Sequence, residues 1–312
     1  MRLLSARGLL LPFCAVLLLT ACHSNEPGAS TPEAAIQGTV DQLKAKDFNA
    51  LLKHALPPAD YANLRADWQK REQDAQPITA EDRVKFSAAL QKFTAPNAET
   101  ELYTELQPKL DAMQKQYSDQ LPVLLKMGTG FLKNGVAENQ RLSAAQKAQA
   151  ESMLDVLGPW AQKTSWFDQA KAKQAVGVAV ATARKLDLKG PDQLRTMDFD
   201  TAMTKYSLGF AGAKQLLQIY GLSLDDTLKS VKVHEVSKEN GHAVVKISYT
   251  LLGKPLSAES KLVQQDGRWY SEDLLNDVRK SHAQLSAPAT AASAPIAVQP
   301  AITPTAPTPA KS

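Results

Sequence analysis

The chain has 312 residues, of which 44% are hydrophobic and 22% are charged, so it holds enough apolar material for one or two packed domains. Its 36 basic residues nearly balance its 32 acidic residues, which does not favour a nucleic-acid-binding surface. Two cysteines and five histidines are too few for a disulfide framework or a zinc cluster, and we expect neither a metal nor another cofactor.

The N-terminus has the order of features found in a secretory signal peptide. Arg2 and Arg7 precede an apolar segment at residues 9–19, which is followed by small residues. A segment of about a dozen residues is too short to cross ~30 Å of hydrocarbon as a helix. We therefore expect residues 1–21 to be a signal that is removed.

This signal ends in the sequence Leu-Thr-Ala-Cys at residues 19–22, which resembles the lipobox of bacterial lipoproteins. The resemblance implies cleavage between Ala21 and Cys22 and lipid attachment to the sulfur of Cys22. Lipoproteins that stay in the inner membrane of Gram-negative bacteria usually carry Asp after this cysteine, whereas His23 stands here, which implies the outer membrane. An ordinary signal peptide that happens to end in Ala-Cys is the alternative.

Processing of this kind would leave no free thiol. Cys14 would leave with the signal and Cys22 would become a thioether, so thiol chemistry is excluded for the mature chain. Several acyl chains on one residue make a lasting membrane anchor, whereas a single chain attaches reversibly.

Composition divides the remainder into four parts. Residues 22–31 are polar and predict a flexible tether. Residues 32–229 predict a helical domain and residues 230–285 a small antiparallel β-meander with a terminal helix. Residues 286–312 are rich in proline and alanine and predict a disordered tail. The fold class is therefore α+β and mostly α.

Capping residues predict the first helices. Thr31 and Asp47 begin a helical hairpin over residues 32–56, which we expect either to pack on the C-terminal sheet or to stay with the helical domain. Pro58 opens a further helix and Thr79 caps the next one. An apolar stripe then runs through residues 102–124, with kinks or breaks expected at Pro108 and Pro122.

The later helices have equally clear boundaries. Ser143 begins a capping box, and Gly158-Pro159 predicts the end of that helix. Asp168 opens a helix whose small residues 175–183 indicate tight central packing. Asp198 caps the last long helix, and Gly221 stands where a left-handed C-terminal cap is expected.

The hydrophobic period changes from 3.6 to 2 after residue 230. A two-residue loop would place Ile247 opposite His234 and put the valines on the wrong face of the sheet. A three-residue loop with Gly241 in a bulge places Val233 opposite Ile247, and we predict this register. Further turns are expected at residues 253–255 and at Asp266-Gly267, and a final helix at residues 273–283.

Two segments resemble small bacterial lipoprotein domains of the nuclear transport factor two-like fold. Residues 31–48, from Thr-Pro-Glu to Lys-Asp-Phe, are similar to their helical start, and residues 263–270, Val-Gln-Gln-Asp-Gly-Arg-Trp-Tyr, to their closing hairpin. Roughly 170 mostly helical residues separate the two segments, so either a helical domain is inserted or the similarity is superficial. Because members of that fold include both enzymes and scaffolds, the resemblance implies no activity.

No sequence motif for catalysis, metal binding or phosphate binding is present, and we assign no catalytic, cofactor-binding or metal-binding residue. Gly128 and Gly130 are interpreted as a helix end. The other candidates are interpreted as structural: His234 and His242 on the surface, and the acids at helix starts, which are Glu99, Glu101, Glu105, Asp198 and Asp200.

Aromatic residues offer one further candidate. Trp160 and Trp166 flank a turn and would be able to stack on a sugar, although packing within the protein is the preferred interpretation. Tyr206, Phe210 and Tyr220 fall on the stripe of the last long helix and are predicted to be core.

These observations favour a non-catalytic, lipid-anchored periplasmic protein of the cell envelope. It would bind a protein partner or an apolar ligand in the angle between sheet and helices. An envelope hydrolase or other enzyme with an unrecognised site is one alternative, and it predicts a cleft with converging carboxylates or histidines. A structural spacer between the outer membrane and the cell wall is the other.

Overall fold

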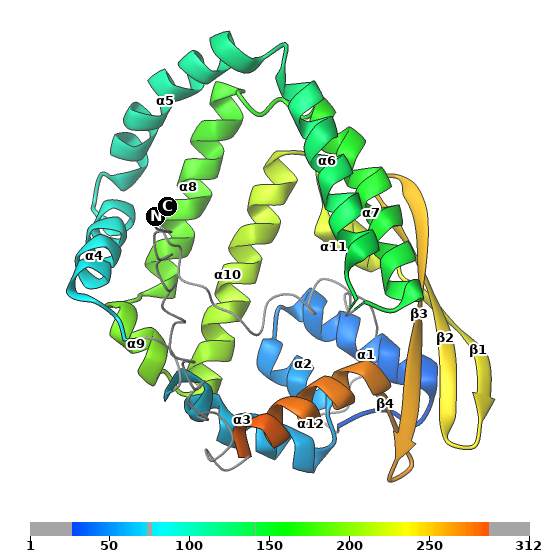
Figure 1. Cartoon of the computed structure of the whole chain (residues 1–312). Coiled ribbons are helices and arrows are strands. Elements are labelled where there is room, and N and C mark those ends of the chain that lie inside the picture. The colour runs from blue at the N-terminus through cyan, green and yellow to red at the C-terminus, as the bar shows by residue number, and fades with distance from the viewer. Residues whose placement is uncertain (1–26, 74–76, 141, 287–312) are drawn as a thin grey trace, which may run out of the picture.

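The computed structural model describes residues 27–73, 77–140 and 142–286. Within them, twelve helices precede or follow a four-stranded antiparallel sheet, so the α+β, mostly helical class is confirmed. The sheet stands at one edge of the molecule, and the long helices extend away from it (Figure 1). The predicted signal, lipid-attachment residue and proline-rich tail lie outside the described residues, apart from Ser286.

The first three helices follow the predicted caps. Helix α1 (Pro32–Ala45) is capped by Thr31 and α2 (Phe48–Ala55) by Asp47, each through a side-chain oxygen that accepts a backbone N–H. Helix α3 (Pro58–Gln73) follows directly. Helices α1 and α2 form the predicted hairpin, and α1 contacts β1, β2 and β4 of the sheet.

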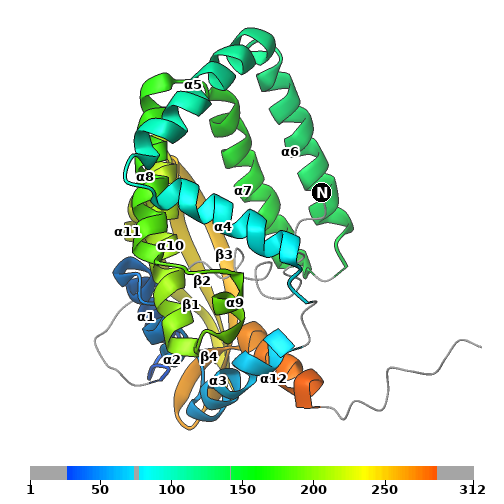
Figure 2. The same cartoon turned by 90° about the vertical axis from the view of Figure 1, so that its left-hand side faces the viewer.

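Helices α4 to α7, Ala80–Lys163, form an extended segment that we call the arch (Figures 1 and 2). Its members are α4 (Ala80–Thr94), α5 (Ala98–Tyr117), α6 (Leu121–Glu138) and α7 (Ala144–Lys163). Thr79 and Ser143 begin the predicted helices, and both cap through capping boxes.

The prolines and glycines of the arch correct three predictions. The predicted break occurs at Pro122, in the first turn of α6, whereas α5 continues through Pro108. Gly158-Pro159 does not end α7, because tertiary packing outweighs the lost backbone donor: Gly158 lies so close to α6 that a Cβ there would be 3.1 Å from Thr129. Gly128 and Gly130 likewise lie inside α6 rather than at its end.

The central helices are α8 (Gln169–Leu186) and α10 (Phe199–Ile219), which pack side by side. Asp168 and Asp198 cap them as predicted, and Gly221 is left-handed after α10. The short helices α9 (Pro191–Thr196) and α11 (Leu224–Lys229) were not predicted. Tyr206 of α10 is 48% exposed, which corrects its assignment to the core; its ring edge packs on Trp68 at the side of the helix.

The sheet is a meander in the order β1-β2-β3-β4. Its strands are β1 (Lys232–Glu239), β2 (His242–Leu251), β3 (Lys254–Gln265) and β4 (Arg268–Ser271). The turn at Asp266-Gly267 is confirmed, and α12 (Glu272–Ser286) forms the final helix.

Register and turn geometry agree only in part with the prediction. Val233 pairs with Ile247 as expected, but the loop has two residues, Asn240 and Gly241, and the extra residue is a bulge at Val236. Both loop residues have positive φ, +49° and +78°, which is the favoured geometry for a two-residue hairpin. The next turn lies at Leu252-Gly253, one residue earlier than predicted, because both residues are left-handed and Lys254 already pairs with Leu251.

Two clusters of buried side chains stabilise the fold. One fills the space between α1, α2, α11 and the sheet and includes Val40, Val245 and Trp269. The other lies between α3, α10, α12 and β4 and includes Leu56, Phe199 and Leu275. The alternate residues of β2 from Ala243 to Leu251 face the first cluster, which explains the period of two in the sequence.

An ion pair and a hydrogen bond hold α12 against α3. Arg279 donates two hydrogen bonds to Asp60, at 2.9 and 2.6 Å, and His282 Nδ1 lies 2.5 Å from Asp67 Oδ2. Asp67 is fully buried and also accepts a bond from Lys70. Burial alone would raise the pKa of the Asp67 carboxyl, but the bonds from His282 and Lys70 outweigh it and hold this pKa below its ordinary value.

We expect Asp67→Asn to lower the free energy of unfolding at neutral pH by about 2 kcal/mol, because hydrogen bonds to a charged group are lost. The folded-state pKa of Asp67 is depressed, so its contribution is present above the unfolded pKa of about 4 and disappears as pH falls through the folded value. Denaturant unfolding between pH 2 and 7 should therefore give curves for the two proteins that converge in acid. A constant difference at every pH would contradict this role of Asp67.

Candidate binding surfaces of the arch

The arch has almost no buried core of its own. Among its described residues, Ala98 and Gly158 alone are buried. Helix α6 packs against α7, and its contact face consists of residues such as Leu125, Thr129 and Val136 at spacings of four and seven. A helix that is covered on one side only leaves its remaining surface in solvent.

The uncovered side of α6 carries large apolar side chains. Their exposed fractions are 59% for Val123, 50% for Leu124, 67% for Met127, 79% for Phe131 and 57% for Leu132. Figure 2 shows α6 on the outer side of α7. We call these five residues the α6 face. Because monomeric proteins rarely expose apolar side chains in such a group, it indicates a contact surface.

The charges on α6 are of one sign over most of its length. Lys126 and Lys133 are the charged residues of the segment 121–137, and Glu138 follows at the C-terminal end. Lys126 is exposed, whereas Lys133 is partly covered and forms an ion pair with Asp155 of α7. The α6 face is therefore apolar with a basic border.

A hollow of about 420 Å³ lies where the end of α7 meets α10 and the turn between β2 and β3. Three of its lining residues are lysines, and we call it the lysine hollow. It is lined by Asp155, Val156, Pro159, Trp160, Lys163, Thr164, Ser165, Lys171, Tyr220, Leu252 and Lys254.

The predicted aromatic pair adjoins this hollow. Trp160 packs edge to face on Trp166 with ring centres 5.5 Å apart, and Trp166 packs on Tyr220 at 5.1 Å. Trp160 also donates its indole N–H to the Tyr220 carbonyl at 2.9 Å. Burial and the nearby Asp168 raise the pKa of the Tyr220 hydroxyl. The preferred interpretation of internal packing is thus confirmed for Trp166, while Trp160 also lines the hollow.

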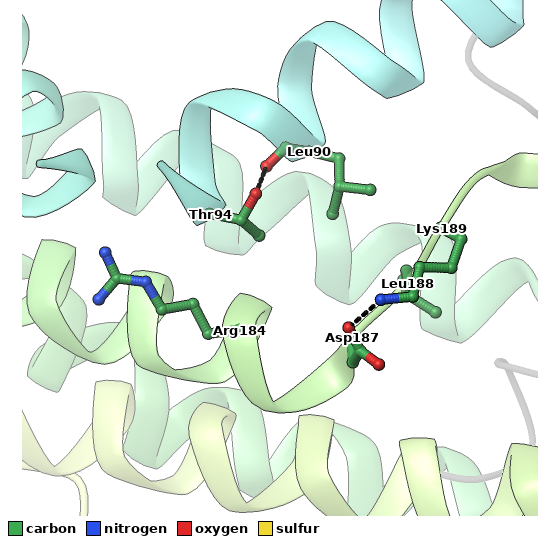
Figure 3. Close-up of a pocket in the computed structure, with 6 residues that line it drawn as sticks. All are labelled: Leu90, Thr94, Arg184, Asp187, Leu188 and Lys189. Carbon is green, nitrogen blue, oxygen red and sulfur yellow. Dashed lines mark hydrogen bonds and ion pairs between the residues drawn. The ribbon is translucent and has the colours of Figure 1, made fainter. Parts of the chain in front are cut away.

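A second hollow, of about 380 Å³, lies between α4 and the end of α8 (Figure 3). Its charged groups are already engaged: Lys189 pairs with Asp187 at 2.5 Å, and Arg184 binds Glu99 and the Ala95 carbonyl. The Arg184 contacts hold the arch to α8. The geometry therefore assigns this hollow a structural role.

The remaining candidate residues do not form one site. His234 pairs with Lys246 on the strand and is exposed, as is His242 beside the turn. Glu105 pairs with Lys92, and Glu101 lies in the first turn of α5. Among the described residues no group of three or more His, Cys, Asp and Glu side chains is arranged to hold a metal ion.

Asp200 belongs to a polar network that the sequence did not predict. Arg65 donates two bonds of 2.5 Å to Asp200, and Asn49 donates one of 2.8 Å to the same carboxylate. The bond from Arg65 holds the pKa of Asp200 below its ordinary value, and Asp200 raises the pKa of Arg65. Tyr61 completes the network by donating to Asn49. The network joins α2, α3 and α10 and is a structural tie.

No family model, curated protein or solved structure matches the chain. No helix in the described part of the chain is both long and apolar enough to cross a membrane. Cys22 and Ala21, the predicted lipid-attachment and cleavage residues, lie outside the described residues. The α6 face and the lysine hollow are therefore the two surfaces that bear on function.

The sequence contains a signal for the α6 face. The stripe predicted for residues 102–124 includes Leu121 and Leu124, but apolar residues occur on more than one side of the segment 121–137. No comparable signal exists for the lysine hollow, since Lys163 and Lys254 are far apart in the chain.

Proposed function

We propose that this protein is a non-catalytic, lipid-anchored protein of the bacterial periplasm that binds a partner protein through the α6 face. The observation that supports it is the exposure of Met127 and Phe131 on a helix packed on one side only. Burying a side chain of this size contributes about 1.5–3 kcal/mol, so five of them supply the apolar centre of an interface.

The shape of the surface favours a protein over a small apolar ligand. Ligand pockets enclose most of their ligand, whereas the side chains of the α6 face project from a single outer helix. An amphipathic or apolar helix commonly binds in a groove of a partner protein. The basic border at Lys126 favours a groove with an acidic rim. The partner is thus an envelope protein with an apolar, acid-rimmed groove.

The proposed anchor is Cys22, at the end of the segment that resembles a lipobox. We expect wild-type protein from its native host to carry acyl chains at Cys22 and to sediment with the outer membrane. Cys22→Ser should lose both the added mass and the membrane association, because the sulfur that receives the lipid is removed. Intact mass spectrometry and membrane fractionation measure the two effects. An unchanged mass and unchanged fractionation would contradict the anchor.

The double variant Met127→Gln/Phe131→Gln tests the contact surface. Both side chains are mostly exposed, so we expect the free energy of unfolding to change by less than about 0.5 kcal/mol. Binding of the partner should weaken strongly because two apolar anchors are lost. Purification after crosslinking in cells, with quantification of each crosslinked protein, compares the variant with wild type.

The matched control is Lys185→Gln, an exposed position on α8 away from the α6 face. It should leave the crosslinked partner unchanged. Equal recovery of every crosslinked protein with the double variant and with wild type would overturn the proposal.

A further inference from the structure

The lysine hollow brings together three cations from distant parts of the chain. Lys163 ends α7, Lys171 lies in the first turns of α8, and Lys254 begins β3. None of the three ammonium groups has an ion pair with a described residue. The one acid that lines the hollow, Asp155, is paired with Lys133.

Three lysines without ion-pair partners favour the binding of an anion. The nearby Asp168 carboxylate caps α8, where it accepts the backbone N–H of Lys171. Separated lysines on a surface are usually neutralised by mobile ions at little cost, but three that line one concave site raise the local positive potential. A bound carboxylate or phosphate would accept hydrogen bonds from the ammonium groups, and such charge-assisted bonds are about twice as strong as neutral ones.

The rest of the lining is suited to a ring that has an apolar face and hydroxyl groups. Trp160, Tyr220 and Leu252 line the hollow together with the hydroxyl-bearing Thr164 and Ser165. The bond from the Trp160 indole to the Tyr220 carbonyl and the packing on Trp166 fix the aromatic rings before any ligand arrives. A wall held in place in this way loses little conformational freedom on binding.

We propose that the lysine hollow binds a small, ring-containing organic anion with the chemistry of a sugar acid or sugar phosphate. Its volume of about 420 Å³ falls within the range of small-molecule sites, about 300–1,000 Å³. An inorganic anion would leave the aromatic wall uncovered, and a neutral sugar would leave the lysines without partners. This site is separate from the α6 face and does not depend on partner binding.

The test uses the mature chain, residues 22–312, with Cys22→Ser, in solution. The probes are galacturonic acid, glucose 6-phosphate, glucose and inorganic phosphate. Calorimetry and NMR titration of the Trp160 indole signal measure binding. We expect at least one of the two anionic sugars to bind at least tenfold more tightly than both glucose and phosphate. Binding of neither anionic sugar, or equal binding of glucose, would overturn the proposal.

Two lysine variants locate the site. Lys163→Gln/Lys171→Gln/Lys254→Gln should weaken binding of the anionic sugar at least tenfold, whereas Lys232→Gln, an exposed lysine on β1, should not change it. Circular dichroism checks that both variants are folded. Equal affinity of the triple variant and wild type, with both folded, would show that the hollow is not the site.

A third arm asks whether the ligand is free or part of a glycan. Trigalacturonic acid presents the same acidic ring within a chain. Tighter binding of the trimer than of the monomer supports a glycan unit, and equal or weaker binding supports a free small molecule. Both results support the proposed chemistry, while trimer binding that survives the triple substitution overturns it.

Discussion

Gly38→Val is expected to lower the free energy of unfolding by about 3 kcal/mol. Gly38 lies in α1 where that helix meets α2, and a Cβ there would be 2.1 Å from Nε2 of the buried His54. His54 donates from this nitrogen to the Ala35 carbonyl at 3.1 Å, so a ring displaced by the added side chain would lose this bond. The cost combines overpacking, a lost hydrogen bond and a β-branched residue in a helix.

The matched control is Gly209→Ala in α10, where nothing lies within 4 Å of the added Cβ. It should raise the free energy of unfolding by as much as about 1 kcal/mol, because alanine favours a helix over glycine. Urea unfolding followed by circular dichroism measures both variants. If Gly38→Val is as stable as wild type, the close packing of α1 on α2 is wrong.

Trp269→Ala is expected to lower the free energy of unfolding by about 4 kcal/mol. Trp269 is 1% exposed and lies in the cluster between α1 and the sheet. Its backbone N–H donates to the Ala29 carbonyl at 2.9 Å, and Lys238 lies over its ring at 5.3 Å. Removal of the ring leaves a cavity among the buried residues of this cluster, and the lost burial adds to the cost.

Trp269→Phe separates the packing of the ring from its polar atom. The indole Nε1 is buried and has no hydrogen-bond partner among the described residues. Replacement by phenylalanine therefore breaks no hydrogen bond to a described residue and costs lost volume, about 1–2 kcal/mol. Unfolding of both variants should rank alanine well below phenylalanine. Equal losses would show that the Trp269 nitrogen has a partner that stabilises the fold.

Local signals in the sequence predicted the element boundaries well. A short polar side chain caps a helix because it satisfies backbone donors of the first turn, so a cap can be predicted without knowledge of the rest of the fold. The caps predicted in this way are Thr31, Asp47, Asp168 and Asp198. The fold class followed from the same local patterns, with the period of two after residue 230 marking the sheet.

Predictions failed where distant packing decides the outcome. Pro159 is tolerated inside α7 because α6 and Tyr220 hold that helix, and neither neighbour is visible in the local sequence. The predicted pairing of Val233 with Ile247 was right, and it requires one extra residue in the hairpin. That residue was predicted in the loop at Gly241. It lies at Val236 instead, because Asn240 and Gly241 both adopt the left-handed conformation of a two-residue loop.

The candidate surfaces were harder to predict than the fold. Apolar periodicity identifies a helix face but does not say whether another element covers it, so Phe131 was indistinguishable from a core residue. The lysine hollow depends on the approach of the β2–β3 turn to the end of α7, which is a tertiary contact.

We propose that a partner protein covers the α6 face in the cell. Photo-crosslinking in cells of the native host tests this contact, with a reactive side chain placed at position 127 or 131 and position 185 on α8 as control. We predict one discrete adduct of this chain with a different envelope protein from positions 127 and 131, and none from position 185. No adduct, an adduct with lipid, or an adduct with a second copy of the chain would contradict the claim.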